Sequence, residues 1–235
     1  LFNLFKLIPS ILLAVLIHRL ASDRWRYAYR VLLVVPMIVP SLTTLFIWKF
    51  FLDPNIGALN RMLDITGLKG VLVSIDHFFG WGVFLADHPI GWLSQPELVL
   101  PSLFLWGFPW IGAVGVLIFL AGLQSISPEI YEAAELDGIG PLGKFFHIEL
   151  PLILTQVRLS LVLLIVSTLQ GYVLQLLLLG DSGGPDGRGM VPGLWMYNRA
   201  FIAGEFGYAC AVGIIIFAFI LVLTLINNKY VRIDK

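Results

Sequence analysis

Residues 127–151 read SPEIYEAAELDGIGPLGKFFHIELP, and this stretch carries most of the information about the fold. Its Ser-Pro-Glu start (127–129) predicts the beginning of a helix: the hydroxyl can cap free amides, proline fits the first helical position, and an acid favours the positive end. Gly138 can close that helix in the left-handed conformation. Gly140-Pro141 predicts a second short helix over Leu142 to about Glu149. Two short helices joined at a glycine corner would form a compact, projecting elbow.

The chain as a whole is strongly apolar. Of its 235 residues, 58% are hydrophobic and 13% are charged, whereas ordinary globular chains carry roughly 25% charged residues. The mean hydropathy is +0.90. The net charge is zero, which gives no sign of binding to a polyanion such as nucleic acid. The single cysteine, Cys210, excludes an intramolecular disulfide and a cysteine-rich metal cage. This composition excludes a disordered tail, a coiled coil and a typical cytosolic enzyme, and it predicts a membrane protein.

Five apolar stretches around the elbow are long enough to cross a membrane. A bilayer core about 30 Å thick needs about 20 mostly apolar residues per helix. We therefore expect an all-α, polytopic membrane protein with a single domain over residues 1–235 and an elbow at about residues 124–151. The expected spans are residues 4–20, 31–51, 98–123, 152–170 and 206–226.

Residues 71–85 are also apolar but short, and they contain Asp76 and His77. We expect an interfacial or re-entrant piece there. The pairs Asp76-His77 and Asp87-His88 fit a solvated surface better than a metal site, because each pair stands alone and structural metal sites need more ligands.

Lys and Arg cluster on one side of these spans. The dense groups lie in the first connection and in the C-terminal tail: Arg19, Arg24, Arg26, Arg30, Lys229, Arg232 and Lys235. By the positive-inside rule, these segments and the elbow should be cytoplasmic, including the C-terminus. The first residue would then lie outside. Since it is not methionine and already belongs to an apolar run, we expect at least one further span before Leu1. A cleaved signal peptide is the alternative, but the sequence keeps no charged n-region or cleavage site.

The spacing inside the elbow matches a known motif. Glu132-Ala133-Ala134 is followed by three residues, then Gly138, and later by Ile148-x-Leu150-Pro151. This pattern resembles the EAA loop of binding-protein-dependent ABC importer permeases, apart from Ile139, where alanine is usual. Residues 121–126, the loop Gly183-Gly184-Pro185 and residues 206–209 resemble the sugar-uptake branch of that family. The resemblance covers nearly the whole chain; the family's N-terminal tail and first helix are what it lacks.

The resemblance implies a type I ABC importer permease-like helical bundle in the cell inner membrane, with about six spans in the full-length protein. Such a permease pairs with a second, similar permease, receives a sugar or related polyol from an external solute-binding protein, and has no catalytic residue or cofactor of its own. ATP hydrolysis takes place in a separate cytoplasmic ATP-binding subunit, onto which the elbow docks. The docking residues implied by the motif are Glu132, Ala133, Ala134, Asp137 and Gly138. Glu132 would supply charge, the alanines close packing, and Gly138 the turn.

Other functions remain open. The chain could be a permease for an amino acid, phosphate or a peptide, since these share the elbow. From a different class, it could be a passive channel or a membrane enzyme whose loop lies on the membrane surface. The sequence contains no Gly-x4-Gly-Lys-Ser/Thr run and no His-Glu-x-x-His motif, so neither an ATP site nor a metal site is expected.

A polar cluster follows the fourth apolar stretch. Gln170, Tyr172 and Gln175 lie close together, and Gly171 permits a helix break between them. A broken helix at membrane depth is tolerated only where it lines a cavity or is buried in protein. Amides and an aromatic face also suit a hydroxyl-rich substrate. We expect these three residues to line a translocation pathway; the alternative is that they form hydrogen bonds between helices.

Residues 180–185, GDSGGP, match the string around the nucleophile of trypsin-like serine proteases. Such a serine needs a histidine base that is oriented by a carboxylate. His18 and His147 are expected on the opposite side of the membrane from Ser182. His77 and His88 are on its side but in unrelated contexts, and no histidine follows Ser182 to serve a rhomboid-type site. We predict a turn-rich external loop without protease activity.

Overall fold

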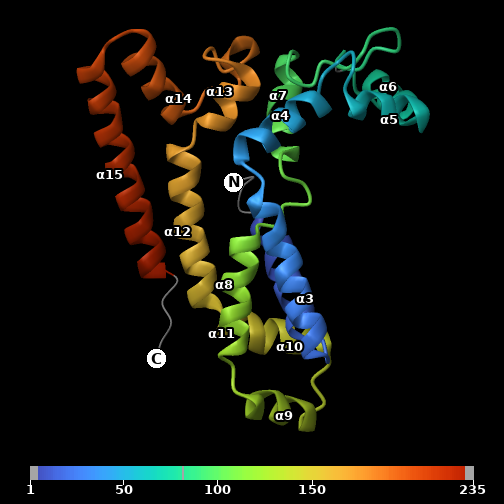
Figure 1. Cartoon of the computed structure of the whole chain (residues 1–235), viewed down its shortest axis with the longest axis vertical. Coiled ribbons are helices and arrows are strands. Elements are labelled where there is room, and N and C mark those ends of the chain that lie inside the picture. The colour runs from blue at the N-terminus through green and yellow to red at the C-terminus, as the bar shows by residue number, and fades with distance from the viewer. Residues whose placement is uncertain (1–4, 81, 231–235) are drawn as a thin grey trace. The chain divides into compact units, whose positions relative to one another are not determined.

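The computed structural model describes residues 5–80 and 82–230, and the regular structure in these residues is helical throughout (Figure 1). The α-helices are α2 (Leu7–His18), α3 (Asp23–Val34), α4 (Ser41–Phe51), α5 (Ala58–Ile65), α6 (Leu68–Phe79), α7 (Pro96–Leu105), α8 (Ala113–Gln124), α9 (Pro128–Leu136), α10 (Pro141–Lys144), α11 (Leu150–Leu152), α12 (Leu154–Gln170), α13 (Val173–Leu179), α14 (Pro192–Tyr197) and α15 (Phe206–Tyr230). Short 3₁₀ segments occur at η1 (Val35–Ile38) and η3 (Pro185–Gly187), and π-helical segments at η2 (Phe145–Glu149) and η4 (Asn198–Ile202).

The chain forms two compact units. The first consists of Leu1–Ile38, Gly107–Thr168 and Phe217–Lys235, and the second of Val39–Trp106 and Leu169–Ile216. Each unit combines segments that are distant in sequence. The elbow belongs to the first unit, and the break at Gly171 belongs to the second.

The first unit is built on the packing of α2 against α8. Ala14 on α2 and Phe119 on α8 are fully buried in this core, which also includes Ile153 at the start of α12. Ser10 ties α2 to the chain before α8, because its hydroxyl donates to the Trp110 carbonyl and accepts the Gly112 amide at 3.1 Å. These contacts fix α2 beside α8, and both helices lead toward the elbow.

The second unit has its own core around Leu52 and Trp92. The buried Asn60 side chain donates to the Ile90 carbonyl at 3.0 Å and accepts the Trp92 indole N–H at 2.8 Å, which pins the loop before α7. Asp76 is buried here too and accepts the Val83 amide at 3.0 Å. The expectation that Asp76 is a solvated surface residue is therefore wrong. Its carboxylate holds the chain that follows α6, which ends at Gly80 with φ +67°.

Three of the predicted apolar stretches correspond closely to helices. Residues 4–20 contain α2, although Leu4 lies outside the described residues; residues 152–170 contain α12; and α15 begins at Phe206 as predicted. The other two stretches are interrupted. Residues 31–51 break between Ile38 and Ser41, because Pro36 and Pro40 cannot continue an α-helical hydrogen-bond ladder. Residues 98–123 break between α7 and α8, where Gly107, Pro109 and Gly112 replace helix formers.

The length and composition of the observed helices show which of them could cross a membrane. Within residues 5–80 and 82–230, Phe206–Lys229 is the one unbroken helix long and apolar enough to cross a membrane, and counting each interrupted pair as one span raises the number to as many as four. The interrupted pairs are Asp23–Ile38 with Ser41–Phe51, Ala113–Gln124 with Pro128–Leu136, and Pro141–Leu152 with Leu154–Gln170. α2 and α7 are shorter apolar helices. The count of about five spans and the single-domain organisation stay predictions.

Candidate functional site

The first half of the elbow folds as its sequence predicts. α9 begins at Pro128, and Ser127 before it has an extended backbone (φ −66°, ψ 143°). The Ser127 hydroxyl makes no capping hydrogen bond, so this part of the expected cap is absent. Gly138 has φ +71°, the left-handed conformation expected of it. Its amide donates to the Glu135 carbonyl at 3.0 Å, and the Ile139 amide donates to the Ala134 carbonyl at 2.9 Å. These bonds satisfy carbonyls at the end of α9 and close the corner.

The second half of the elbow is longer than expected. It begins at Pro141, as predicted, but continues through η2 and α11 to Leu152. The wider π-turn ends at Glu149, two residues before Pro151. In a regular α-helix the ring of Pro151 would clash with the carbonyl four residues earlier, and a local change of helix type relieves such a clash. The helical stretch Pro141–Leu152 and α12 are bent by 66° relative to each other.

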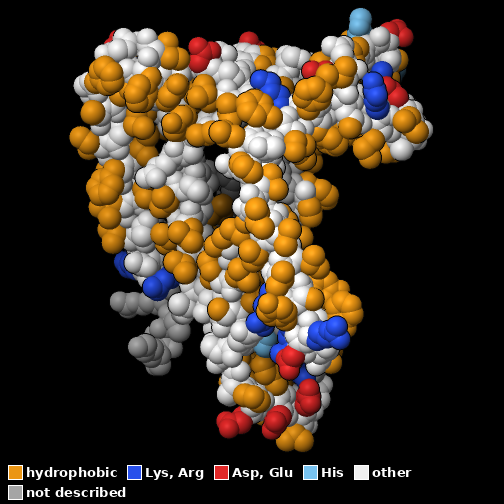
Figure 2. Space-filling model, viewed as in Figure 1, with side chains coloured by type: hydrophobic (Ala, Val, Ile, Leu, Met, Phe, Trp, Pro, Cys, Tyr) orange, Lys and Arg blue, Asp and Glu red, His pale blue; other side chains and the backbone are white. Residues whose placement is uncertain are grey.

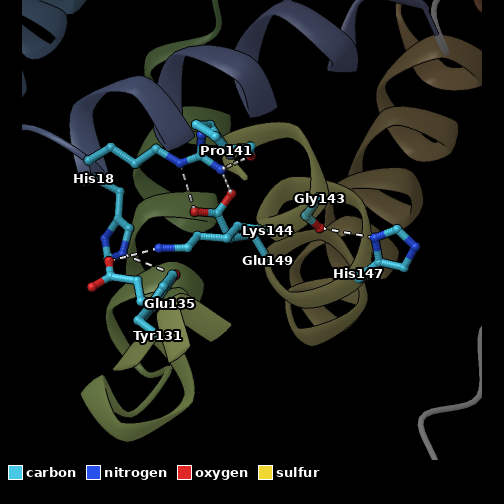
Figure 3. Close-up of polar contacts among 9 residues, drawn as sticks. His18, Tyr131, Glu135, Pro141, Gly143, Lys144, His147 and Glu149 are labelled. Carbon is cyan, nitrogen blue, oxygen red and sulfur yellow. Dashed lines mark hydrogen bonds and ion pairs between the residues drawn. The ribbon is translucent and has the colours of Figure 1, made fainter. Parts of the chain in front are cut away.

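A buried ion pair joins the end of α2 to the elbow (Figure 3). The Glu149 side chain is 0% exposed, and Arg19 approaches it with two nitrogens: Nη2 lies 2.7 Å from Oε2 and Nε lies 3.0 Å from Oε1. The same Arg19 Nη2 donates to the Pro141 carbonyl at 2.8 Å. One guanidinium therefore links α2, the start of α10 and the end of η2. Such a two-point contact fixes geometry more tightly than a point charge would.

A second contact between α2 and the elbow lies beside this pair. His18 Nε2 and the Tyr131 hydroxyl are 3.2 Å apart, and their rings lie 5.8 Å apart (Figure 3). Burial, with a smaller contribution from the negative charge of Glu149, raises the pKa of Tyr131 to about 12. Tyr131 therefore stays protonated at neutral pH and can share a hydrogen bond with the imidazole.

The two helices of the elbow are also joined across the glycine corner. Lys144 Nζ lies 2.8 Å from Glu135 Oε1 (Figure 3). The hydrogen bond and charge of Lys144 lower the pKa of Glu135, so the carboxylate is ionised at neutral pH. This pair is exposed, and it holds the corner from its solvent side.

The docking residues implied by the sequence do not all reach the surface. Glu132, Ala133, Asp137 and Gly138 are exposed, whereas Ala134 is 3% exposed and packs inside the chain. Ala134 is therefore not part of an exposed docking surface in this structure. Figure 2 shows Asp and Glu side chains gathered over α9. Two leucines that the sequence did not single out are exposed here: Leu136, at 90%, and Leu142, at 76%.

A cavity of about 400 Å³ lies between α2, α3, the end of α8 and α9. Charged and polar side chains from these helices line it, together with Ile126 and Pro128: His18, Arg26, Gln124, Tyr131, Glu132 and Glu135. It places Glu132 beside cationic and hydrogen-bonding groups of the chain itself.

Sequence reasoning missed Arg19 and Glu149. Arg19 counted only toward membrane orientation, and Glu149 was the variable letter of the Ile-x-Leu-Pro motif. The signal that could have found Glu149 is its place between Ile148 and Leu150, because an acid inside an apolar segment usually has a partner. Nothing local in the sequence identifies that partner, which lies 130 residues earlier.

The polar cluster lies at a real helix break. α12 ends at Gln170, and α13 begins at Val173, as the position of Gly171 predicts. Gln170 is exposed, while Tyr172 and Gln175 are half-buried. Within residues 5–80 and 82–230, neither glutamine amide has a hydrogen-bond partner, so the alternative of hydrogen bonds between helices finds no support inside this chain.

Aromatic residues extend from this break. The Tyr172 ring stacks on Tyr197 at 5.1 Å, and Tyr197 lies 5.2 Å from Phe201. Gly193 packs directly on the break, since a Cβ at this position would lie 2.8 Å from the Gln170 carbonyl oxygen. The break is thus supported by close backbone packing, and one aromatic face and the two glutamine amides surround it.

Hydrogen bonds within the Ser182 loop hold its conformation. The Ser182 amide donates to Asp181 Oδ1 at 2.9 Å, and the Gly189 amide donates to the Gly183 carbonyl at 2.8 Å. Gly183 has φ +71°, and a Cβ there would lie 2.8 Å from the Met190 nitrogen. Among the described residues, no histidine forms a hydrogen bond with Ser182. The glycines of this loop are explained by its turns.

We expect serine-directed fluorophosphonates to leave Ser182 unlabelled, because no histidine of the described residues is hydrogen-bonded to its hydroxyl to activate it. Mass spectrometry of the treated, purified chain measures this, with trypsin as the positive control. A fluorophosphonate adduct on Ser182 would contradict the prediction.

Comparison with known proteins places these features in a family. Residues 10–232 match the family described as "Binding-protein-dependent transport system inner membrane component". The chain is 31% identical over 197 residues to the diacetylchitobiose uptake system permease protein NgcF of Streptomyces coelicolor, covering 83% of this chain and 50% of that protein. It is 29% identical over 221 residues to the maltose/maltodextrin transport system permease protein MalF of Escherichia coli K12, covering 89% of this chain and 39% of that protein. The chain thus spans about half of the length of NgcF and 39% of the length of MalF.

The fold agrees with a solved structure. A chain of a bacterial alginate ABC transporter, crystallised in complex with an alginate pentasaccharide-bound periplasmic protein, superposes with a TM-score of 0.77 at 23% identity, over 99% of this chain and 73% of that chain. This likeness confirms the all-α, type I ABC permease fold. From the family match over residues 10–232 and from the fold, we conclude that the chain belongs to the binding-protein-dependent transport system inner membrane components.

Proposed function

We propose that this chain is the membrane-spanning permease subunit of an ATP-driven importer for a sugar or related polyol. Residues 1–235 would act as a single permease domain with about five spans and a cytoplasmic C-terminus. Its partners would be a cytoplasmic ATP-binding subunit, a second homologous permease and an external solute-binding protein. The elbow carries the proposal: two short helices closed at Gly138, with Glu132 and Leu136 exposed beside the corner. The sugar class is supported by relatives named for diacetylchitobiose and maltose uptake.

The contacts of the elbow suggest how motion would pass through it. An ATP-binding subunit that moves the elbow also moves whatever the elbow holds rigidly. Arg19 connects the elbow to α2, and α2 packs on α8 through fully buried side chains. The elbow, α2 and α8 would therefore tilt together as a rigid body, which opens and closes a pathway elsewhere. Gln170, Tyr172 and Gln175 would line that pathway.

Reconstitution tests the proposal directly. The chain is co-expressed with the ATP-binding subunit, second permease and binding protein encoded beside its gene, and the purified assembly is placed in vesicles. We expect the ATP-binding subunit to co-purify, and uptake of a labelled oligosaccharide to require ATP. ATP-independent uptake would support a passive channel instead. ATP-driven uptake of an amino acid, phosphate or a peptide, but of no sugar, would contradict the proposed substrate class.

Replacing Gln170 or Gln175 with leucine should lower uptake about tenfold with unchanged assembly. Each substitution removes an amide that has no partner in the described chain and that would otherwise bind a substrate hydroxyl, an interaction of about 1 kcal/mol or more. Uptake per assembled complex is the measurement. Val173→Leu, which changes an exposed neighbour at the same break, is the control. Loss of assembly with normal uptake per complex would mean that the glutamines are only structural.

A further inference from the structure

The helix α3 is unusual because none of its 12 residues is buried. Residues 24–30 combine three arginines with the exposed aromatic residues Trp25, Tyr27 and Tyr29, and residues 31–34 are apolar. Aromatic and basic residues next to an apolar segment are typical of the interface between membrane and water. Hydrophobic side chains cover the visible face of this region (Figure 2). The first unit of the chain therefore leaves this face uncovered.

A groove follows the uncovered face. It encloses a cavity of about 350 Å³, and its lining comes from one arginine and five apolar side chains: Arg30, Val31, Val34, Val35 and Ile38 of α3 and η1, and Leu117 of α8. Helical spacing explains the set, because residues four apart lie on one face. Arg30, Val34 and Ile38 follow this spacing, with Val31 and Val35 beside them. The groove thus has a cationic end and an apolar remainder.

Arg30 forms the cationic end of the groove. Its Nε is buried, and it has no hydrogen-bond partner among residues 5–80 and 82–230. A buried donor without a partner is unfavourable, and for a charged group the cost is larger still. Arg24, six residues earlier on α3, is exposed and does not line the groove. The groove therefore holds one specific cation that an anionic group could satisfy.

The length of the groove matches one leaflet of a membrane. From Arg30 to Val34 the chain advances about 6 Å at the α-helical rise, and through η1 to Ile38 it advances about 8 Å more at the 3₁₀ rise, about 14 Å in all. Half of a bilayer core is about 15 Å. A molecule with an anionic group at Arg30 and an apolar tail along the valines would fit both the length and the polarity of the groove.

We propose that this groove is a binding site for one anionic phospholipid, whose phosphate accepts hydrogen bonds from Arg30 and whose acyl chain lies along Val34 and Ile38. Arginine is well suited to a phosphate because its planar fork of donors can bond two oxygens at once. The site is independent of the transported substrate and of the elbow's partner.

The purified transporter, equilibrated in nanodiscs of mixed phosphatidylglycerol and phosphatidylcholine, tests the site by native mass spectrometry of the retained lipid. The wild-type chain should retain phosphatidylglycerol in preference to phosphatidylcholine. Arg30→Gln should weaken phosphatidylglycerol binding about tenfold, because it removes the charge-assisted hydrogen bonds that the guanidinium donates to the phosphate. The matched control, Arg24→Gln, removes an equal charge from the same helix outside the groove and should leave retention unchanged. Equal retention of both lipids, or equal losses in the two variants, would overturn the proposal.

Three further measurements address the apolar part. Val34→Trp, which fills the groove while keeping Arg30, should lower phosphatidylglycerol retention as well. Glycerophosphate, which has the anionic group without acyl chains, should not displace the bound lipid. A photo-crosslinking benzoyl-phenylalanine at Val35 should capture lipid. Capture of another polypeptide at Val35 instead would show that a protein segment covers the groove, and would also overturn the proposal.

Discussion

Arg19→Met should destabilise the protein by about 3 kcal/mol, because it leaves the buried Glu149 carboxylate without its partner. Breaking a buried ion pair from one side costs about 3–5 kcal/mol. We expect the lower end of that range, since the Arg19 side chain is 32% exposed and water can reach part of the site. The carbonyl of Pro141 loses a charged donor in the same variant. Denaturant unfolding of the purified chain in detergent, followed by tryptophan fluorescence, measures the loss.

Two variants separate the ion pair from general damage. Arg19→Met combined with Glu149→Leu removes both charges and should recover most of the lost stability, because apolar residues often replace a buried pair at little cost. Lys144→Met, which removes the exposed contact to Glu135, should have a much smaller effect. If the Arg19→Met chain unfolds at the same denaturant concentration as the wild type, the ion pair does not hold the elbow.

Gly138→Val should lower uptake at least about tenfold while the chain still reaches the membrane. A β-branched residue at φ +71° is strained, whatever space is available. A Cβ at Gly138 would meet no atom within 4 Å, so the strain comes from the backbone alone. The corner would relax to another conformation, which moves Glu132 and Leu136 relative to α10. The reconstituted transporter should then hydrolyse ATP without matching uptake.

The control for this variant lies two residues away. Gly140 has φ −70°, and a Cβ there would also meet nothing within 4 Å. Gly140→Ala should therefore leave both uptake and ATP hydrolysis near wild-type values. Normal coupled transport by the Gly138→Val protein would show that the shape of the corner does not matter for coupling.

The sequence predicted those parts of the fold that depend on local chemistry. Pro128 and Pro141 begin helices, Gly138 closes one, and Gly171 interrupts another, because the backbone preferences of proline and glycine act within a few residues. The same signals were present at Pro36 and Pro40, but counting apolar residues alone joined two helices into one stretch. Periodicity and hydropathy measure how apolar a segment is, and they do not show where it bends.

What the sequence did not predict depends on contacts between distant segments. The partner of Glu149 lies on α2, and the burial of Asp76 depends on a chain reversal that brings Val83 back onto α6. Ala134 also faces its own chain rather than the surface. Each outcome requires the tertiary packing of elements, for which one sequence contains no local pattern.

The contact between Gly193 and the Gln170 carbonyl has an evolutionary consequence. Every amino acid other than glycine would place a carbon against a backbone oxygen at that point, where no side-chain rotation can relieve the overlap. Selection should therefore act more strongly against substitution of Gly193 than of Gly207, where an added carbon meets no atom within 4 Å. Among relatives that differ in substrate, we therefore expect the side chains around this contact to vary while this position stays glycine.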